Sequence, residues 1–65
     1  MKTITVINDF INGNLKDARK GAEEFGVGAL VRCMEHYYGY SENKARAVAL
    51  WLKTGEEFQA ACDAV

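Results

Sequence analysis

Residues 27–53 read VGALVRCMEHYYGYSENKARAVALWLK, and this stretch decides the fold. Apolar residues recur every three or four positions on both sides of Gly39, which is the spacing of the buried face of an α-helix. Glycine readily ends a helix, and Ser41 is a favourable N-cap for a following one. The stretch therefore predicts helices over residues 27–38 and 42–53. The residues expected on their buried faces are Val27, Leu30, Val31, Met34, Tyr38, Ala45, Val48, Ala49 and Leu52.

Upstream, the pattern predicts another helix over residues 15–25, with Asn14 as its N-cap and Gly26 closing it. Gly21 lies in the middle of this helix, where it costs about 1 kcal/mol relative to alanine. A close crossing of two helices would explain a glycine there. The apolar face of the predicted helix consists of Leu15, Ala18, Ala22 and Phe25.

The N-terminal segment, residues 1–13, carries two conflicting patterns. Ile4 and Val6 alternate with threonines, as in a strand, whereas Ile7, Phe10 and Ile11 follow helical spacing. A single strand would need a partner from a second copy of the chain. We therefore favour a short helix ending at residues 12–13, where glycine can adopt the left-handed conformation.

After residue 53, Thr54-Gly55-Glu56-Glu57 has the pattern of a capping box, which predicts a last helix. The apolar face of this helix would consist of Phe58, Ala61, Cys62 and Val65. The whole pattern predicts an all-α fold, a compact bundle of four to five short helices. We expect residues 1–65 to form one domain, with residues 14–65 as its helical core.

Composition excludes several functional classes. The 65 residues include 8 basic and 9 acidic side chains, for a net charge of −1, which argues against a large nucleic-acid-binding surface. No apolar stretch approaches the roughly 20 residues that span a bilayer, and the first residues lack the apolar core of a signal peptide. We therefore expect a cytoplasmic protein with no membrane contact.

The candidates for chemistry are few. Cys33 and His36 are spaced to share one side of a helix, and Cys62 with Asp63 could complete a zinc site, but structural zinc sites usually use paired ligands on turns. A cysteine nucleophile would also need an orienting group and a pocket. We interpret both cysteines as buried thiols and His36 as a residue at the helix rim. We therefore expect no metal, no cofactor and no enzymatic activity.

Protein binding is the better-supported class. Several aromatic residues crowd the end of the helix at 27–38, and residues 4–11 are apolar on more than one side. Exposed aromatic side chains are common anchors of protein contacts, although these rings could instead enlarge the core. A second copy in a homodimer or another protein could cover such a surface. The predicted interaction residues are Ile7, Phe10, Ile11, Tyr37, Tyr40 and Trp51.

A basic cluster at residues 16–20 is the other surface feature. Lys16, Arg19 and Lys20 share one helix and could contact phosphates. Given the neutral net charge, we interpret them as a solvated face that pairs with Glu23 and Glu24.

Much of the chain resembles small proteins encoded by tailed bacteriophages. The resemblance covers residues 15–64 and implies an accessory protein that binds a protein of the bacterial host. It is carried by Ala18-Arg19-Lys20-Gly21-Ala22, Phe25, Ser41-Glu42-Asn43-Lys44-Ala45, Leu52-Lys53-Thr54-Gly55 and Phe58-Gln59-Ala60-Ala61-Cys62-Asp63-Ala64.

Two shorter resemblances imply other roles. Gly39-Tyr40-Ser41, Ala45, Thr54-Gly55 and Ala60-Ala61 are similar to the three-helix ubiquitin-associated domain, although the helix before Thr54 is about one turn too long. Residues 47–65 resemble a helix-turn-helix, as in the small terminase subunits of phages, which implies DNA binding. The second helix of that motif would be acidic, whereas DNA-reading helices are usually basic or neutral. A DNA-binding accessory protein is therefore the alternative to protein binding.

Overall fold

The computed structural model describes residues 2–55, and this part of the chain forms four α-helices and no strand. They are α1 (Thr3–Ile11), α2 (Leu15–Ala22), α3 (Val27–Tyr38) and α4 (Glu42–Thr54). The prediction of an all-α fold is confirmed for these residues. The last helix predicted from the sequence lies outside them.

The ambiguous first segment is helical. α1 buries Val6 and Ile7, and its C-cap Asn12 donates its backbone N–H to the Asn8 carbonyl oxygen at 2.9 Å. Gly13 follows with a φ of +84°, a left-handed conformation that glycine adopts without strain. The predicted end of the helix at residues 12–13 is therefore confirmed, and the strand interpretation is wrong.

α2 is shorter than predicted at its C-terminal end. The helix stops at Ala22 rather than at residue 25, and the backbone N–H groups of Glu23, Glu24 and Phe25 bond to carbonyl oxygens three residues earlier. Lys53 of α4 donates from its ammonium group to the carbonyl oxygens of Ala22 at 3.1 Å and Phe25 at 2.7 Å. A charged donor at the end of a helix satisfies carbonyl groups that have no partner within the helix. Asn14 occupies the predicted N-cap position of α2, but its side chain makes no cap hydrogen bond. Gly26 does not close α2 and is instead the N-cap residue of α3.

α3 and α4 form the hairpin that the sequence predicts. α3 has the predicted bounds, and Gly39 ends it in the left-handed conformation with a φ of +69°. Ser41 caps α4 by accepting a hydrogen bond from the Lys44 backbone N–H at 3.2 Å. α4 runs one residue further than predicted, so Thr54 is its last residue and donates its hydroxyl to the Leu50 carbonyl oxygen at 2.8 Å. The predicted bond from Thr54 to Glu57 lies outside the described residues.

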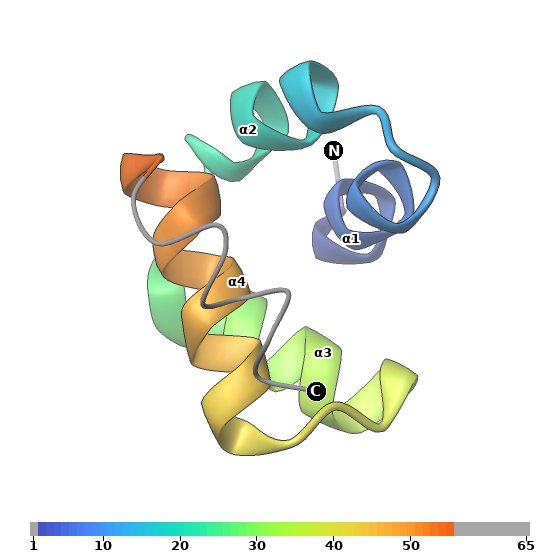
Figure 1. Ribbon diagram of the computed structural model, residues 1–65, viewed down its shortest axis with the longest axis vertical. Helices are drawn as coiled ribbons and strands as arrows, with labels where there is room; N and C mark the ends of the chain where they lie inside the picture. The colour runs from blue at the N-terminus through green and yellow to red at the C-terminus, as the bar shows by residue number, and fades with distance from the viewer. Residues whose placement is uncertain (1, 56–65) are drawn as a thin grey trace.

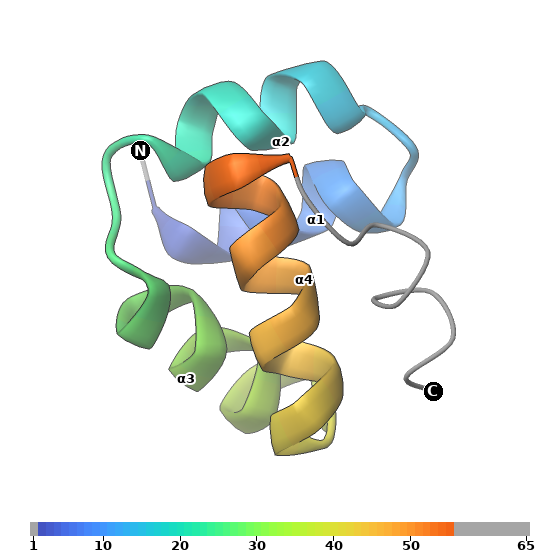
Figure 2. The ribbon, with the colours of Figure 1, turned by 60° about the vertical axis from the view of Figure 1, so that its left-hand side comes forward.

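The helices surround the core as a closed ring. α1 packs on α2, α2 on α4, α4 on α3, and α3 on α1, as Figure 1 shows looking into the ring and Figure 2 shows from the side of α4. Each helix therefore buries side chains against two neighbours. The buried residues are Val6, Ile7, Ala18, Ala22, Leu30, Cys33, Met34, Ala45, Val48, Ala49, Trp51 and Leu52.

Candidate functional site

The six predicted interaction residues separate into three groups by exposure. Ile7 is fully buried and Trp51 is 8% exposed, so their prediction as surface residues is wrong. Phe10 and Tyr40 are half-buried against the core. Only Ile11 and Tyr37 expose half or more of their surface to solvent, with exposed fractions of 50% and 66%.

These two exposed residues do not belong to one surface. Ile11 is the last residue of α1, whereas Tyr37 shares a depression with Lys2, Thr3 and Ile4 at the other end of that helix. An α-helix rises 1.5 Å per residue, so Ile4 and Ile11 lie about 10 Å apart along α1. The single apolar surface predicted from the sequence is therefore divided between the two ends of α1.

The most prominent exposed side chain, Tyr37 of α3, lies next to the N-terminal end of α1. Tyr37 sits beside Ile4, which is 37% exposed, and its ring meets the His36 ring edge-on, with centroids 4.8 Å apart. Arg32 and Lys2 line the two depressions that adjoin Tyr37, which measure about 310 and 440 Å³. We call Lys2, Ile4, Arg32, His36 and Tyr37 the Tyr37 surface.

The neighbouring residue, Tyr38, holds the two helices under this surface together. Its hydroxyl donates to Asn8 Oδ1 at 2.6 Å and lies 3.2 Å from the Ile4 carbonyl oxygen, which can share the same proton. Partial burial raises the pKa of Tyr38 above its usual 10.0, and the nearby Cys33 and Tyr40 raise it further. The neutral hydroxyl therefore fixes Ile4 on α1 relative to Tyr37 on α3.

Sequence reasoning missed the exposed apolar residue Leu50 of α4. Leu50 is 43% exposed and lines a groove of about 370 Å³ between α3 and α4, together with Val27, Gly28, Val31 and Arg46. Arg46 forms an ion pair with Glu42 at 3.3 Å, one turn earlier on α4. Leu50 does not fit the helical spacing of the buried residues predicted on α4. This mismatch is the sequence feature that could have indicated its exposure.

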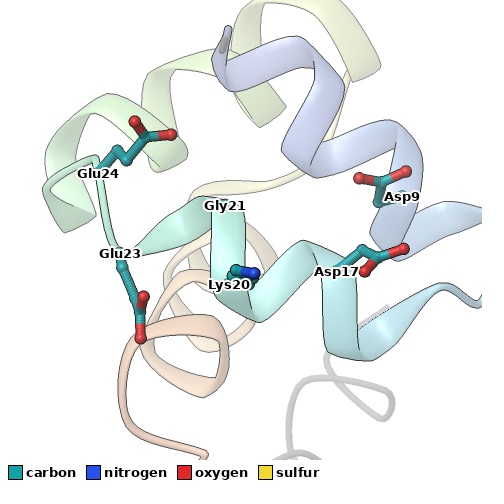
Figure 3. Close-up of a pocket in the computed structure, with 6 residues that line it drawn as sticks. All are labelled: Asp9, Asp17, Lys20, Gly21, Glu23 and Glu24. Atoms are coloured by element: carbon teal, nitrogen blue, oxygen red, sulfur yellow. The ribbon is translucent and has the colours of Figure 1, made fainter.

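The basic cluster predicted on α2 is dispersed. Arg19 lies over the Trp51 ring, with its guanidinium carbon 5.4 Å from the ring centroid, and Lys20 lines an open depression of about 600 Å³ that is mainly acidic. In Figure 3, Asp9 and Asp17 lie close together at one end of this depression, and Glu23 and Glu24 at the other. The ion pair found among residues 2–55 joins Arg46 to Glu42. The predicted ion pairs between basic residues of α2 and Glu23 or Glu24 are not observed in this part of the chain.

Cys33 and His36 do approach one another, since both line the smaller depression beside Tyr37. Cys33 is only 4% exposed, whereas His36 is exposed. Among residues 2–55, no three side chains of His, Cys, Asp or Glu are grouped to hold a metal ion. Cys62 and Asp63, which the sequence offers as further ligands, lie outside this range.

Comparisons with known proteins leave the site to be interpreted from its own geometry. No family, curated protein or solved structure matches the chain. Within the described residues, none of the helices has the length and apolar character needed to cross a membrane.

Proposed function

We propose that this domain is a non-enzymatic accessory protein that binds a partner protein through the Tyr37 surface. The observation that carries the proposal is the 66% exposed side chain of Tyr37 beside the exposed Ile4, on two helices that Tyr38 joins by a hydrogen bond. A tyrosine offers a large contact area with few torsions to restrict on binding. Because the backbone beneath it is already fixed, little order has to be gained when a partner binds.

The charge around Tyr37 indicates the chemistry of the partner. The basic side chains of Lys2 and Arg32 flank the apolar pair, and the Glu35 carboxylate lies beside Arg32 and His36. Arginine and tyrosine are enriched among the residues that dominate binding energy. A partner segment with an apolar side chain flanked by acidic residues would complement this arrangement.

The resemblance to phage-encoded proteins supports a bacterial host protein as the partner. Such an accessory protein would act in the cytoplasm of the host cell, by occupying a surface of the host protein rather than by chemistry. A second copy of the chain is the other protein that the same surface could bind.

The test is affinity capture from bacterial lysate, with and without nuclease treatment, using the full chain and its Tyr37→Ala variant. We expect a captured protein that the variant loses, and about 30-fold weaker binding of the purified partner, as for loss of about 2 kcal/mol at a dominant contact. Leu50→Ala is the matched control, because it removes an exposed apolar side chain from a groove that shares no residue with the Tyr37 surface.

Three results would contradict the proposal. The first is equal capture by the Tyr37→Ala variant and the full chain. The second is equal loss of capture in the Leu50→Ala control. The third is binding that depends on nucleic acid and disappears with nuclease, which would support the DNA-binding alternative instead. Sedimentation of the purified chain shows whether a second copy is the partner.

A further inference from the structure

One side of α1 faces solvent and carries two exposed isoleucines. α1 packs on α2 and on α3, and Ile4 and Ile11 on its remaining surface are 37% and 50% exposed. Seven residues are close to two helical turns, so these side chains project in nearly the same direction from the two ends of the helix. Asn8 lies between them and is also exposed. We call Ile4, Asn8 and Ile11 the α1 face.

The charges at the two ends of α1 are the reverse of those that stabilise a helix dipole. Lys2 is the N-cap residue, at the positive end, and the first turn contains no acidic residue. Asp9 lies in the last turn, at the negative end, with Asp17 of α2 close to it in Figure 3, and this turn contains no basic residue. None of these three side chains belongs to the ion pair found among residues 2–55. Each end of α1 therefore favours an approaching group of the opposite charge.

We propose that the α1 face binds the α1 face of a second copy of this chain, with the two helices antiparallel about a two-fold axis. In this pairing Ile4 of each copy packs on Ile11 of the other. Lys2 of each copy lies beside the carboxylates of Asp9 and Asp17 of the other, and the opposite ends of the two helix dipoles lie side by side. A two-fold axis forms every such contact twice, so one complementary pair of ends covers both copies.

The size of the α1 face sets the strength of the dimer. A helix of nine residues is about 14 Å long, so two α1 helices bury much less than the roughly 800 Å² per copy of a standard interface. The dimer is therefore weak, with a dissociation constant between roughly 1 μM and 1 mM. It shares Lys2 and Ile4 with the Tyr37 surface, so a bound partner protein displaces the second copy. The pairing does not depend on the proposed function, because it needs no other protein.

Charge reversal tests the pairing in sedimentation of the purified full chain. Lys2→Glu and Asp17→Lys should each weaken dimerisation about tenfold, since each places like charges opposite one another twice. The double variant restores opposite charges and should regain the original dissociation constant. Glu24→Lys is the matched control for Asp17→Lys. It makes the same charge change at the other end of the same depression, as Figure 3 shows, and should leave dimerisation unchanged.

The apolar contact is tested by Ile11→Asp, which should leave the chain monomeric. Leu50→Asp is its control, because Leu50 is 43% exposed in the groove between α3 and α4, away from the α1 face. Helical circular dichroism shows whether each variant is folded. If a variant unfolds, nuclear Overhauser contacts between Ile4 and Ile11 of different copies in a mixture of labelled and unlabelled chain still decide the question.

Four results would overturn the proposal. They are a monomeric unsubstituted chain at about 1 mM, a double charge variant that fails to recover dimerisation, equal weakening by a control variant, and contacts between copies through Leu50 instead of Ile11. Capture of a lysate protein through Tyr37 is a separate measurement, so this pairing and the proposed function can each fail without the other.

Discussion

Two side chains connect helices that are far apart in the sequence. Tyr38 joins α3 to α1, and Lys53 joins α4 to the turn after α2, over separations of 30 and 28 residues for their shortest bonds. Periodicity placed Tyr38 on the buried face of its helix and did not include Lys53 in the buried face of the next, but it could not predict either bond. Such bonds depend on how the helices are arranged around the core, and a local pattern contains no information about that arrangement.

Tyr38→Phe should lower the free energy of unfolding by about 1 kcal/mol, the usual net value of a hydrogen bond in a protein. The ring remains and only the hydroxyl that meets Asn8 is lost. Chemical denaturation of both proteins at neutral pH measures the difference. Tyr37→Phe is the control, since the exposed Tyr37 ring makes its ring contact with His36 without using its hydroxyl.

The pH dependence of stability should also reveal Tyr38. Its pKa is raised in the folded protein, so the folded state holds the hydroxyl proton more tightly than the unfolded state does. The stabilisation is therefore complete below pH 10 and declines as the pH rises through the folded pKa. We expect a loss of stability above pH 10 in the unsubstituted protein that is smaller in Tyr38→Phe. An equal loss in the two proteins would show that the hydroxyl is not held in its neutral form.

Lys53→Met should destabilise the fold by about 1–2 kcal/mol, because hydrogen bonds from a charged group are stronger than neutral ones and this one is partly exposed. Methionine keeps most of the apolar stem but removes the ammonium donor from both carbonyl groups, so that Ala22 keeps only its bond from the Phe25 backbone N–H at 3.1 Å. Lys16→Met, on the exposed side of α2, serves as the control. Equal midpoints of thermal unfolding for the two variants would contradict the capping role.

At the scale of the helices, the observed helix boundaries match the predicted ones best where strong local signals, such as glycines, mark the ends. α3 begins and ends where predicted, because a glycine lies at each of its ends. α2 ends three residues earlier than predicted, and Lys53, a residue of another helix, bonds to the carbonyl oxygen of its last residue, Ala22, which no local pattern could show. α1 carried both strand and helix patterns, and its helical form buries Val6 and Ile7 together, which strand alternation would place on opposite faces.

The N-caps predicted for α2 and α4 allow a direct comparison. Ser41→Ala should cost about 1 kcal/mol, because the Ser41 hydroxyl accepts a hydrogen bond from the Lys44 backbone N–H. Asn14→Ala should change stability by much less, because the Asn14 side chain makes no such bond at the start of α2. Urea unfolding of both variants measures the contrast. A larger effect at Asn14 than at Ser41 would contradict these cap assignments.

At the scale of the whole molecule, the division between core and surface was only partly predictable. Tyr37 and Ile11 were correctly expected to be exposed, but Ile7 and Trp51 are buried. Trp51 lies off the main apolar spacing of α4, yet it is covered because α1 and α2 approach that side of α4 and bring Phe10 and Arg19 to its ring. The closed ring of helices buries more than one side of α4, and an analysis of single helices cannot show this.

The same ring predicts how the molecule unfolds. Each helix packs on two neighbours, so the loss of one helix exposes part of the core of the others. Met34→Ala removes a fully buried side chain of α3 and should cost about 2–5 kcal/mol, which is comparable to the whole stability expected of so small a domain. We expect helical circular dichroism and the fluorescence of Trp51 on α4 to fall at the same, lowered temperature in this variant. Loss of helix signal while Trp51 emission stays native would mean that the α3 side of the ring unfolds independently, which this packing does not permit.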